Sequence, residues 1–172
     1  MLYSPYAIPP TDHGEDLVST ASYSAKSSGW DTSGSYVYTR GYDGNEGTET
    51  HGASSEQWFE FTVTAAQTIT YARVFEDNSG ASSLGEWKIS YLDGTVWKDA
   101  FNYRPANAAG WHEPDFAHVP NVKKVRFYGK PPAGSNVEVY EVRFLRFGGE
   151  GCYKTNSHAN AKQERSAIRS RV

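Results

Sequence analysis

A glycine-rich polar stretch, residues 38–52, carries the residue types best suited to holding a cation. It contains four glycines, and Asp43, Asn45 and Thr48 add a carboxylate, an amide and a hydroxyl. Hard cations such as Ca²⁺ take oxygen ligands of these kinds together with backbone carbonyls, which glycines allow to converge. The spacing is not that of an EF-hand, because the sixth position counted from Asp43 is Thr48, where that loop needs glycine. The stretch is therefore either a cation cage or an ordinary ordered loop.

Two other polar stretches, residues 28–36 and 102–113, each hold a tryptophan that directly follows a glycine. An exposed aromatic ring can stack on the apolar face of a sugar while charged or amide groups hydrogen-bond its hydroxyls. The candidate ligand-binding residues are Trp30, Tyr36, His51, Arg73, Arg104, Asn107, Trp111 and His112. The alternatives are that each tryptophan closes one end of the fold and that Arg73, in a predicted strand, pairs with a charge on the sheet face.

Residue types used in catalysis are present without the spacing that catalysis needs. There is no Gly-x-Ser-x-Gly elbow and no glycine-rich phosphate loop. The single cysteine, Cys152, lies near the C-terminus with no predictable histidine partner. The histidines, His13, His51, His112, His118 and His158, show no zinc-site spacing. We therefore expect a binding protein and not an enzyme.

The elements that would position these residues are β-strands. Residues 57–63 alternate apolar and polar side chains, and residues 68–75 are rich in β-branched and aromatic residues. Asp93-Gly94 between two such runs predicts a hairpin. The predicted strands are 57–63, 68–75, 86–92, 95–98, 122–128 and 136–145. Several short strands with regular turn signals and almost no helical periodicity predict an all-β antiparallel sandwich or jelly roll.

Length, composition and net charge indicate the number of domains and exclude some classes of function. The 172 residues suit one domain, which we divide into an irregular leader (1–16), a β-sandwich (17–147) and a polar basic tail (148–172). Net charge is −3, but the chain from Glu150 onward carries about +3, which leaves about −6 on the rest. An acidic body argues against nucleic-acid binding. No segment resembles a membrane span or a signal peptide, so we expect an intracellular protein if Met1 is the native start and an extracellular one if this is an excised module.

The order of these features resembles the discoidin, or coagulation factor 5/8 type C, family, a galactose-binding-like jelly roll that includes family 32 carbohydrate-binding modules. The resemblance covers roughly residues 17–147. The stretches that carry it are 17–25, Asp43-Gly-Asn with Thr48, Gln57-Trp-Phe-Glu-Phe, 86–97, Val125-Arg-Phe-Tyr-Gly129 and Val139-Tyr-Glu-Val-Arg-Phe144. The terminal cysteine pair of extracellular discoidin domains is missing, and the basic tail is additional.

The family often carries a structural calcium beside the loop that corresponds to residues 38–52. Matched residue by residue, the resemblance implies ligands from Asp43, Asn45 and Thr48, with Glu141 reaching in from the last strand. Backbone carbonyls near Arg40 and Asn45 would complete the shell. Such an ion pins the loop and performs no chemistry.

Two functional classes remain open. The first is a non-catalytic, lectin-like module that binds a glycan through its loop aromatics. The second is a protein-interaction subunit of a large intracellular assembly of the ciliary or cytoskeletal type, with residues 148–172 used for docking. Phospholipid binding ranks last, because the loops carry few exposed apolar residues other than tryptophan.

Overall fold

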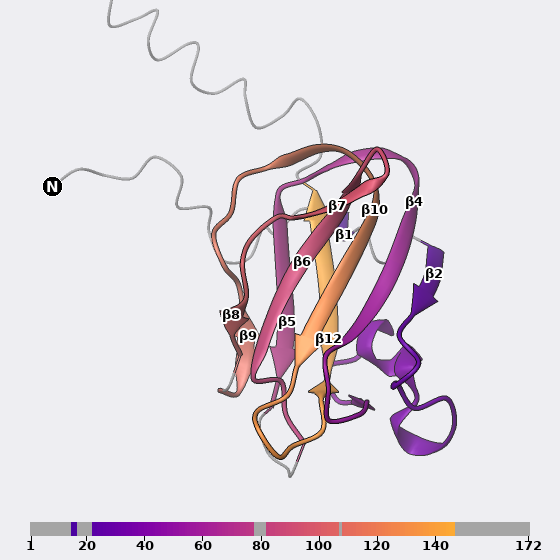
Figure 1. Cartoon of the computed structure of the whole chain (residues 1–172), viewed down its shortest axis with the longest axis vertical. Helices are drawn as coiled ribbons and strands as arrows, with labels where there is room; N and C mark the ends of the chain where they lie inside the picture. The colour runs from indigo at the N-terminus through magenta and orange to yellow at the C-terminus, as the bar shows by residue number, and fades with distance from the viewer. Residues whose placement is uncertain (1–14, 17–21, 78–81, 107, 147–172) are drawn as a thin grey trace, which may run out of the picture.

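The computed structural model describes residues 15–16, 22–77, 82–106 and 108–146 (Figure 1). The strands are β1 (Glu15–Asp16), β2 (Ser22–Lys26), β3 (Thr50–His51), β4 (Gln57–Ile69), β5 (Tyr71–Glu76), β6 (Glu86–Asp93), β7 (Val96–Asp99), β8 (Arg104–Pro105), β9 (Gly110–His112), β10 (Val119–Lys130), β11 (Glu138–Val139) and β12 (Glu141–Arg146). Two 3₁₀ helices, Gly34–Tyr36 and Tyr38–Tyr42, lie between β2 and β3. No helix in these ranges has the length and apolarity of a membrane span.

The strands form two packed antiparallel sheets, as the alternating pattern predicts. The larger sheet has the order β2-β4-β10-β6-β7, with β8 beside β6, and the smaller has the order β1-β12-β5-β9 (Figure 1). A separate two-stranded ribbon pairs β11 with β3. The predicted all-β sandwich is therefore confirmed. The leader's last two residues form β1, while residues 1–14 and 148–172 lie outside the described part of the chain, so the domain boundaries stay a prediction.

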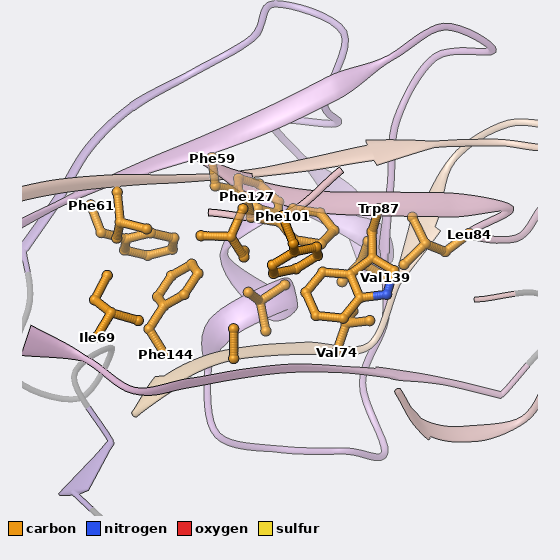
Figure 2. Packing of buried hydrophobic residues seen from close by; sticks show 14 of the residues in the cluster. Phe59, Phe61, Ile69, Val74, Leu84, Trp87, Phe101, Phe127, Val139 and Phe144 are labelled. Carbon is orange, nitrogen blue, oxygen red and sulfur yellow. The ribbon is translucent and has the colours of Figure 1, made fainter. Parts of the chain in front are cut away.

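The core is an aromatic layer between the two sheets (Figure 2). Phe61 of β4 meets Phe144 of β12 edge to face across the sandwich, with ring centroids 5.5 Å apart. Phe127 of β10 packs between Phe59 and Trp87, at 6.1 Å from each ring. Burial of these large rings supplies most of the driving force for the fold and fixes the strands rigidly enough to position loops at their ends.

The β6–β7 hairpin lies where predicted, but its turn is shifted by one residue. Asp93 and Val96 are the closing pair, so the two central residues are Gly94 and Thr95 instead of Asp93 and Gly94. Gly94 has φ 61°, and Asn121 is the only non-glycine residue with positive φ in the described ranges. A hairpin turn with glycine first needs the left-handed conformation at that position alone, which glycine adopts without cost.

The predicted last strand, residues 136–145, is broken in two. β11 leaves the smaller sheet to pair with β3, so that Glu138 faces His51, and β12 then pairs with β5. The chain turns at Tyr140, whose N–H donates to the Phe75 carbonyl at 3.2 Å. This break brings two segments that are far apart in sequence together at one end of the sandwich.

Candidate functional site

The loops that carry the candidate residues gather at one end of the sandwich. β4, β6 and β12 begin there, and β5 and β10 end there, at the lower end in Figure 1. The connections 27–56, 100–106 and 131–137 therefore meet at this end, and the short strand β9 pairs with the end of β5 there. A surface built from several loops on a rigid scaffold is the usual place for a binding site.

A hollow of about 450 Å³ lies beside β9. We call it the Trp111 hollow, and it is lined by Trp87, Arg104, Pro105, Trp111, His112, Glu113, Pro114 and Asp115. The structure thus brings together Arg104, Trp111 and His112, three of the predicted ligand-binding residues. Trp111 and His112 are half-buried, and Arg104 is exposed. The hollow combines an indole surface with a cationic group, an imidazole and two carboxylates.

The Trp111 ring is held in place from the smaller sheet. Phe75 meets it edge to face at 5.4 Å, in register with Trp111 across β5 and β9. The guanidinium of Arg73 lies 3.9 Å from the ring centroid, and that of Arg143 lies 5.4 Å away. Arg73 also pairs with Glu113, with 3.6 Å between Nη1 and Oε1. Arg73 therefore acts as a salt-bridged support for the tryptophan, which was the alternative for this residue.

A second aromatic patch forms at Tyr36 and His51. Their rings stack with centroids 3.9 Å apart and an interplanar angle of 2°. Tyr36 is 41% exposed, whereas His51 is half-buried beneath it. Neither Tyr36 nor His51 lines the Trp111 hollow. The predicted ligand-binding residues thus separate into two groups.

Behind His51 lies an acidic cluster formed by Glu49, His51, Glu76, Asp77 and Glu138. The ligand-type atoms of Glu49, His51 and Glu138 all lie within 4.8 Å of one another, as do those of Glu76, Asp77 and Glu138. Glu138 is 3% exposed. Burial, and then the negative charges of its neighbours in the cluster, raise the pKa of its carboxyl to about 8. Carboxylates crowded in this way favour a proton or a bound cation.

The four predicted metal ligands all make hydrogen bonds within the glycine-rich loop or to it. Oγ1 of Thr48 donates to Oδ2 of Asp43 at 2.9 Å and lies 3.0 Å from the Asn45 carbonyl. Oε2 of Glu141 accepts a hydrogen bond from the N–H of Gly44 at 3.0 Å, although the two residues are 97 positions apart. Glu141 is 1% exposed. Asp43 and Thr48 are thus in direct contact and Glu141 contacts the backbone of the same loop, whereas no hydrogen bond joins Glu141 to Asp43 or Thr48 among the described residues.

Two predicted ligand-binding residues fall outside these groups. Trp30 is 2% exposed, stacks on Phe59 at 4.2 Å and donates from Nε1 to the Trp58 carbonyl at 3.0 Å. The prediction of an exposed ring at Trp30 is wrong, because the ring is an integral part of the core. Asn107 lies outside the described residues.

Several residues of these sites were missed by the sequence reading. Glu113 and Asp115 line the hollow, and Glu49, Glu76, Asp77 and Glu138 form the acidic cluster. The one available signal was Glu138, a carboxylate between two valines of a predicted strand. A charge at such a position is rarely buried without a partner.

No protein-family model matches the chain, and no curated protein matches it in sequence. Solved structures do match it in fold. A chitosan-binding module of a Paenibacillus chitosanase/glucanase superposes with a TM-score of 0.61 at 16% identity, covering 77% of this chain and 99% of that one. A family 32 module from Clostridium perfringens, solved with GalNAc-β-1,3-galactose, gives 0.62 at 14% identity, covering 77% and 100%.

A second Clostridium perfringens family 32 module, solved with galactose, gives a TM-score of 0.60 at 14% identity, covering 75% of this chain and 96% of that one. At these identities the likeness is one of fold. It confirms the fold that the resemblance to the discoidin family implied. The chain has the galactose-binding-like β-sandwich fold that family 32 carbohydrate-binding modules share.

Proposed function

We propose that this protein is a non-catalytic carbohydrate-binding module and that the Trp111 hollow is its sugar site. The observation that carries the proposal is the position of Trp111, a half-buried indole lining a hollow beside Arg104 and His112. Sugars expose C–H groups on one face and hydroxyls around the edge. An aromatic surface rimmed by hydrogen-bonding groups matches both features.

The groups around Trp111 differ in charge and would therefore contact different atoms of a sugar. Arg104 would donate to ring or hydroxyl oxygens, while Glu113 and Asp115 would accept from sugar hydroxyls. His112 is positioned by its own contact, in which Nε2 lies 2.6 Å from the Ala108 carbonyl. A site with both donors and acceptors suits a polyhydroxylated ligand better than a simple anion or cation.

The structural neighbours support the same class of ligand. Three of them are a chitosan-binding module and two modules solved with galactose-containing sugars. Their ligands differ from one another, so the fold favours a glycan without selecting one. The mixed charge of the Trp111 hollow leaves neutral and amino sugars as the first candidates.

A structural calcium in the 38–52 loop forms part of this proposal. Asp43, Thr48 and Glu141 would supply side-chain oxygens, and Asn45 its carbonyl. The contact of Thr48 with Asp43 and the contact of Glu141 with the Gly44 N–H support this choice. Bound calcium would supply no chemistry. It would hold the loop against β12 and so stiffen the end of the sandwich that carries both aromatic patches.

The test is a glycan array with the full chain in calcium-containing buffer. Signal that clusters on one class of sugar is the expected result. A blank array from protein whose circular dichroism shows a folded β-sandwich would overturn the sugar assignment. That result would direct attention to a protein partner and to residues 148–172.

A further inference from the structure

The acidic cluster behind His51 contains close contacts among His51, Glu138 and Glu49, none of which lines the proposed sugar site. Among the ion-pair contacts of the described residues, Glu138 pairs only with His51, and His51 pairs only with Glu138 and Glu49. Nε2 of His51 lies 3.0 Å from Oε2 of Glu138 and 3.7 Å from Oε1 of Glu49. Within the described chain, no Lys or Arg forms an ion pair with Glu49 or Glu138.

One buried oxygen of Glu138, Oε1, has no hydrogen-bond partner among the described residues. Nε2 of His51 is also buried and makes no hydrogen bond there, although it lies 3.0 Å from Oε2 of Glu138. The Glu138 side chain is only 4% exposed, so water does not replace the missing partner freely. A buried polar atom without a partner costs about 1–3 kcal/mol, and natural sites keep such atoms when a ligand satisfies them.

The ligand must be small. Oε1 of Glu138 and Nε2 of His51 are both buried, and the Tyr36 ring stacks on the His51 imidazole at 3.9 Å. A sugar ring therefore has no direct approach to Glu138, whereas a single ion needs only the space between ligand atoms. Glu76 and Asp77 bring further negative charge to the other side of Glu138, which adds to the attraction for a cation.

We propose that Glu49, His51 and Glu138 bind a divalent transition-metal ion of the zinc class. Imidazole and carboxylate are ligands that zinc prefers, whereas calcium and magnesium take oxygen alone. With metal–ligand bonds of about 2.0–2.2 Å, neighbouring ligand atoms around tetrahedral zinc lie roughly 3.3–3.6 Å apart. The two distances from His51 Nε2, 3.0 and 3.7 Å, bracket that spacing.

The metal would join two segments that otherwise meet through one short ribbon. His51 lies on β3 and Glu138 on β11, and they are direct partners in that antiparallel pair. An ion between their side chains would lock the ribbon at the loop end of the sandwich. This site is separate from the calcium loop, which uses Asp43, Thr48 and Glu141, and it does not depend on sugar binding.

The experiment is isothermal titration of the EDTA-treated full chain with Zn²⁺ in the presence of saturating Ca²⁺. We expect one high-affinity zinc ion per chain, Co²⁺ binding at the same site, and a higher thermal midpoint with zinc. His51→Gln and Glu138→Gln should each weaken zinc binding about 100-fold or more. Glu49→Gln should disturb the fold least of the three variants, since the Glu49 side chain is 24% exposed and the glutamine amide replaces no core residue.

The controls are His118→Gln, an exposed histidine outside the cluster, and Cys152→Ser, which removes the only thiol. Both should bind zinc as the unaltered chain does. Near-UV circular dichroism of each variant without metal checks that the fold is kept. Zinc binding that is unchanged in folded Glu49→Gln and His51→Gln, or that is matched by Ca²⁺ or Mg²⁺ at this site, would overturn the proposal, as would the absence of saturable binding.

Discussion

The guanidinium carbon of Arg73 lies 3.9 Å from the centroid of the Trp111 ring. Arg73 comes from the middle of β5 and is held by Glu113, while Trp111 comes from β9 beside it. Cation–π contact fixes the indole without covering it completely, since Trp111 also lines the hollow. The aromatic surface is therefore preorganised before any ligand arrives.

Replacement of Trp111 by alanine should weaken sugar binding at least tenfold, about 1.4 kcal/mol, because the stacking surface is lost. The measurement is isothermal titration with a sugar selected on the glycan array. Trp97→Ala is the matched control. Trp97 also lies against an arginine, with Arg126 at 4.1 Å from its ring, but it belongs to β7 in the larger sheet. Equal losses in both variants would remove Trp111 from the site.

Trp30→Ala should destabilise the protein by about 3–5 kcal/mol, since it removes a large buried ring and leaves a cavity. Trp30 is 2% exposed and stacks on Phe59. Tyr36→Ala, six residues further on, removes a ring that is 41% exposed and should cost much less. Urea unfolding measures both. A loss below about 1 kcal/mol for Trp30→Ala would contradict its place in the core.

The free energy of unfolding should decrease at acidic pH, because the carboxylate of Glu60 becomes protonated. Burial acts to raise the pKa of this carboxyl, but hydrogen bonds from Lys124, Arg126 and Ser24 outweigh it, and the pKa lies below its usual value. A group with a lowered folded-state pKa contributes stability above its unfolded pKa, and that contribution is lost as pH falls through the folded value. The loss therefore begins below about pH 4.5.

The variant Glu60→Gln should have a free energy of unfolding about 1–3 kcal/mol lower at pH 7. The cations of Lys124 and Arg126 would then face a neutral amide instead of a carboxylate. Its unfolding free energy should also depend less on pH in the acid range. Glu86→Gln is the control, since Glu86 is an exposed carboxylate on β6. Urea unfolding between pH 3 and pH 7 gives the comparison. Parallel pH profiles for Glu60→Gln and the unaltered protein would refute the assignment.

Calcium should raise the thermal midpoint of the EDTA-treated protein. At a concentration 100-fold above the dissociation constant, binding adds about 2.7 kcal/mol, or roughly 5–10 °C for a chain of this size. Asp43→Asn should abolish the shift, since a carboxylate ligand is lost. Glu46→Gln, an exposed carboxylate in the same loop, should keep it. Scanning calorimetry measures the thermal midpoint with and without calcium. A calcium-induced increase that persists in Asp43→Asn would show that calcium binds elsewhere.

The sandwich could be predicted from sequence because apolar residues recur at every second position in parts of its strands. Trp87 and Ile89 of β6 are both fully buried, as the period of two requires. The proposed calcium loop could be suggested from sequence because Asp43, Asn45 and Thr48 lie close together in the chain, and it stays a prediction. The polar stretch expected to be a loop at Trp111 is instead the short strand β9, where Trp111 is half-buried.

What could not be predicted depended on contacts between distant segments. Trp30 has the same polar, glycine-flanked setting as Trp111, yet it forms a bridge with Gly52 that draws its ring into the core. A Cβ on Gly52 would lie 3.0 Å from Cε3 of Trp30, so this packing needs glycine there. The acidic cluster likewise exists only because β3 pairs with β11, and the sequence around Glu138 does not show which segment that strand pairs with.

The central claim is that a sugar meets this sandwich at the Trp111 hollow. The most direct test is an NMR titration of ¹⁵N-labelled protein with the sugar identified on the array. The account predicts saturable shifts in the Trp111 indole N–H and in the amides of Arg104 and of residues 110–113, with the Trp97 indole unchanged. Shifts confined to the opposite end of the sandwich, around residues 64–70 and 93–96, would contradict it.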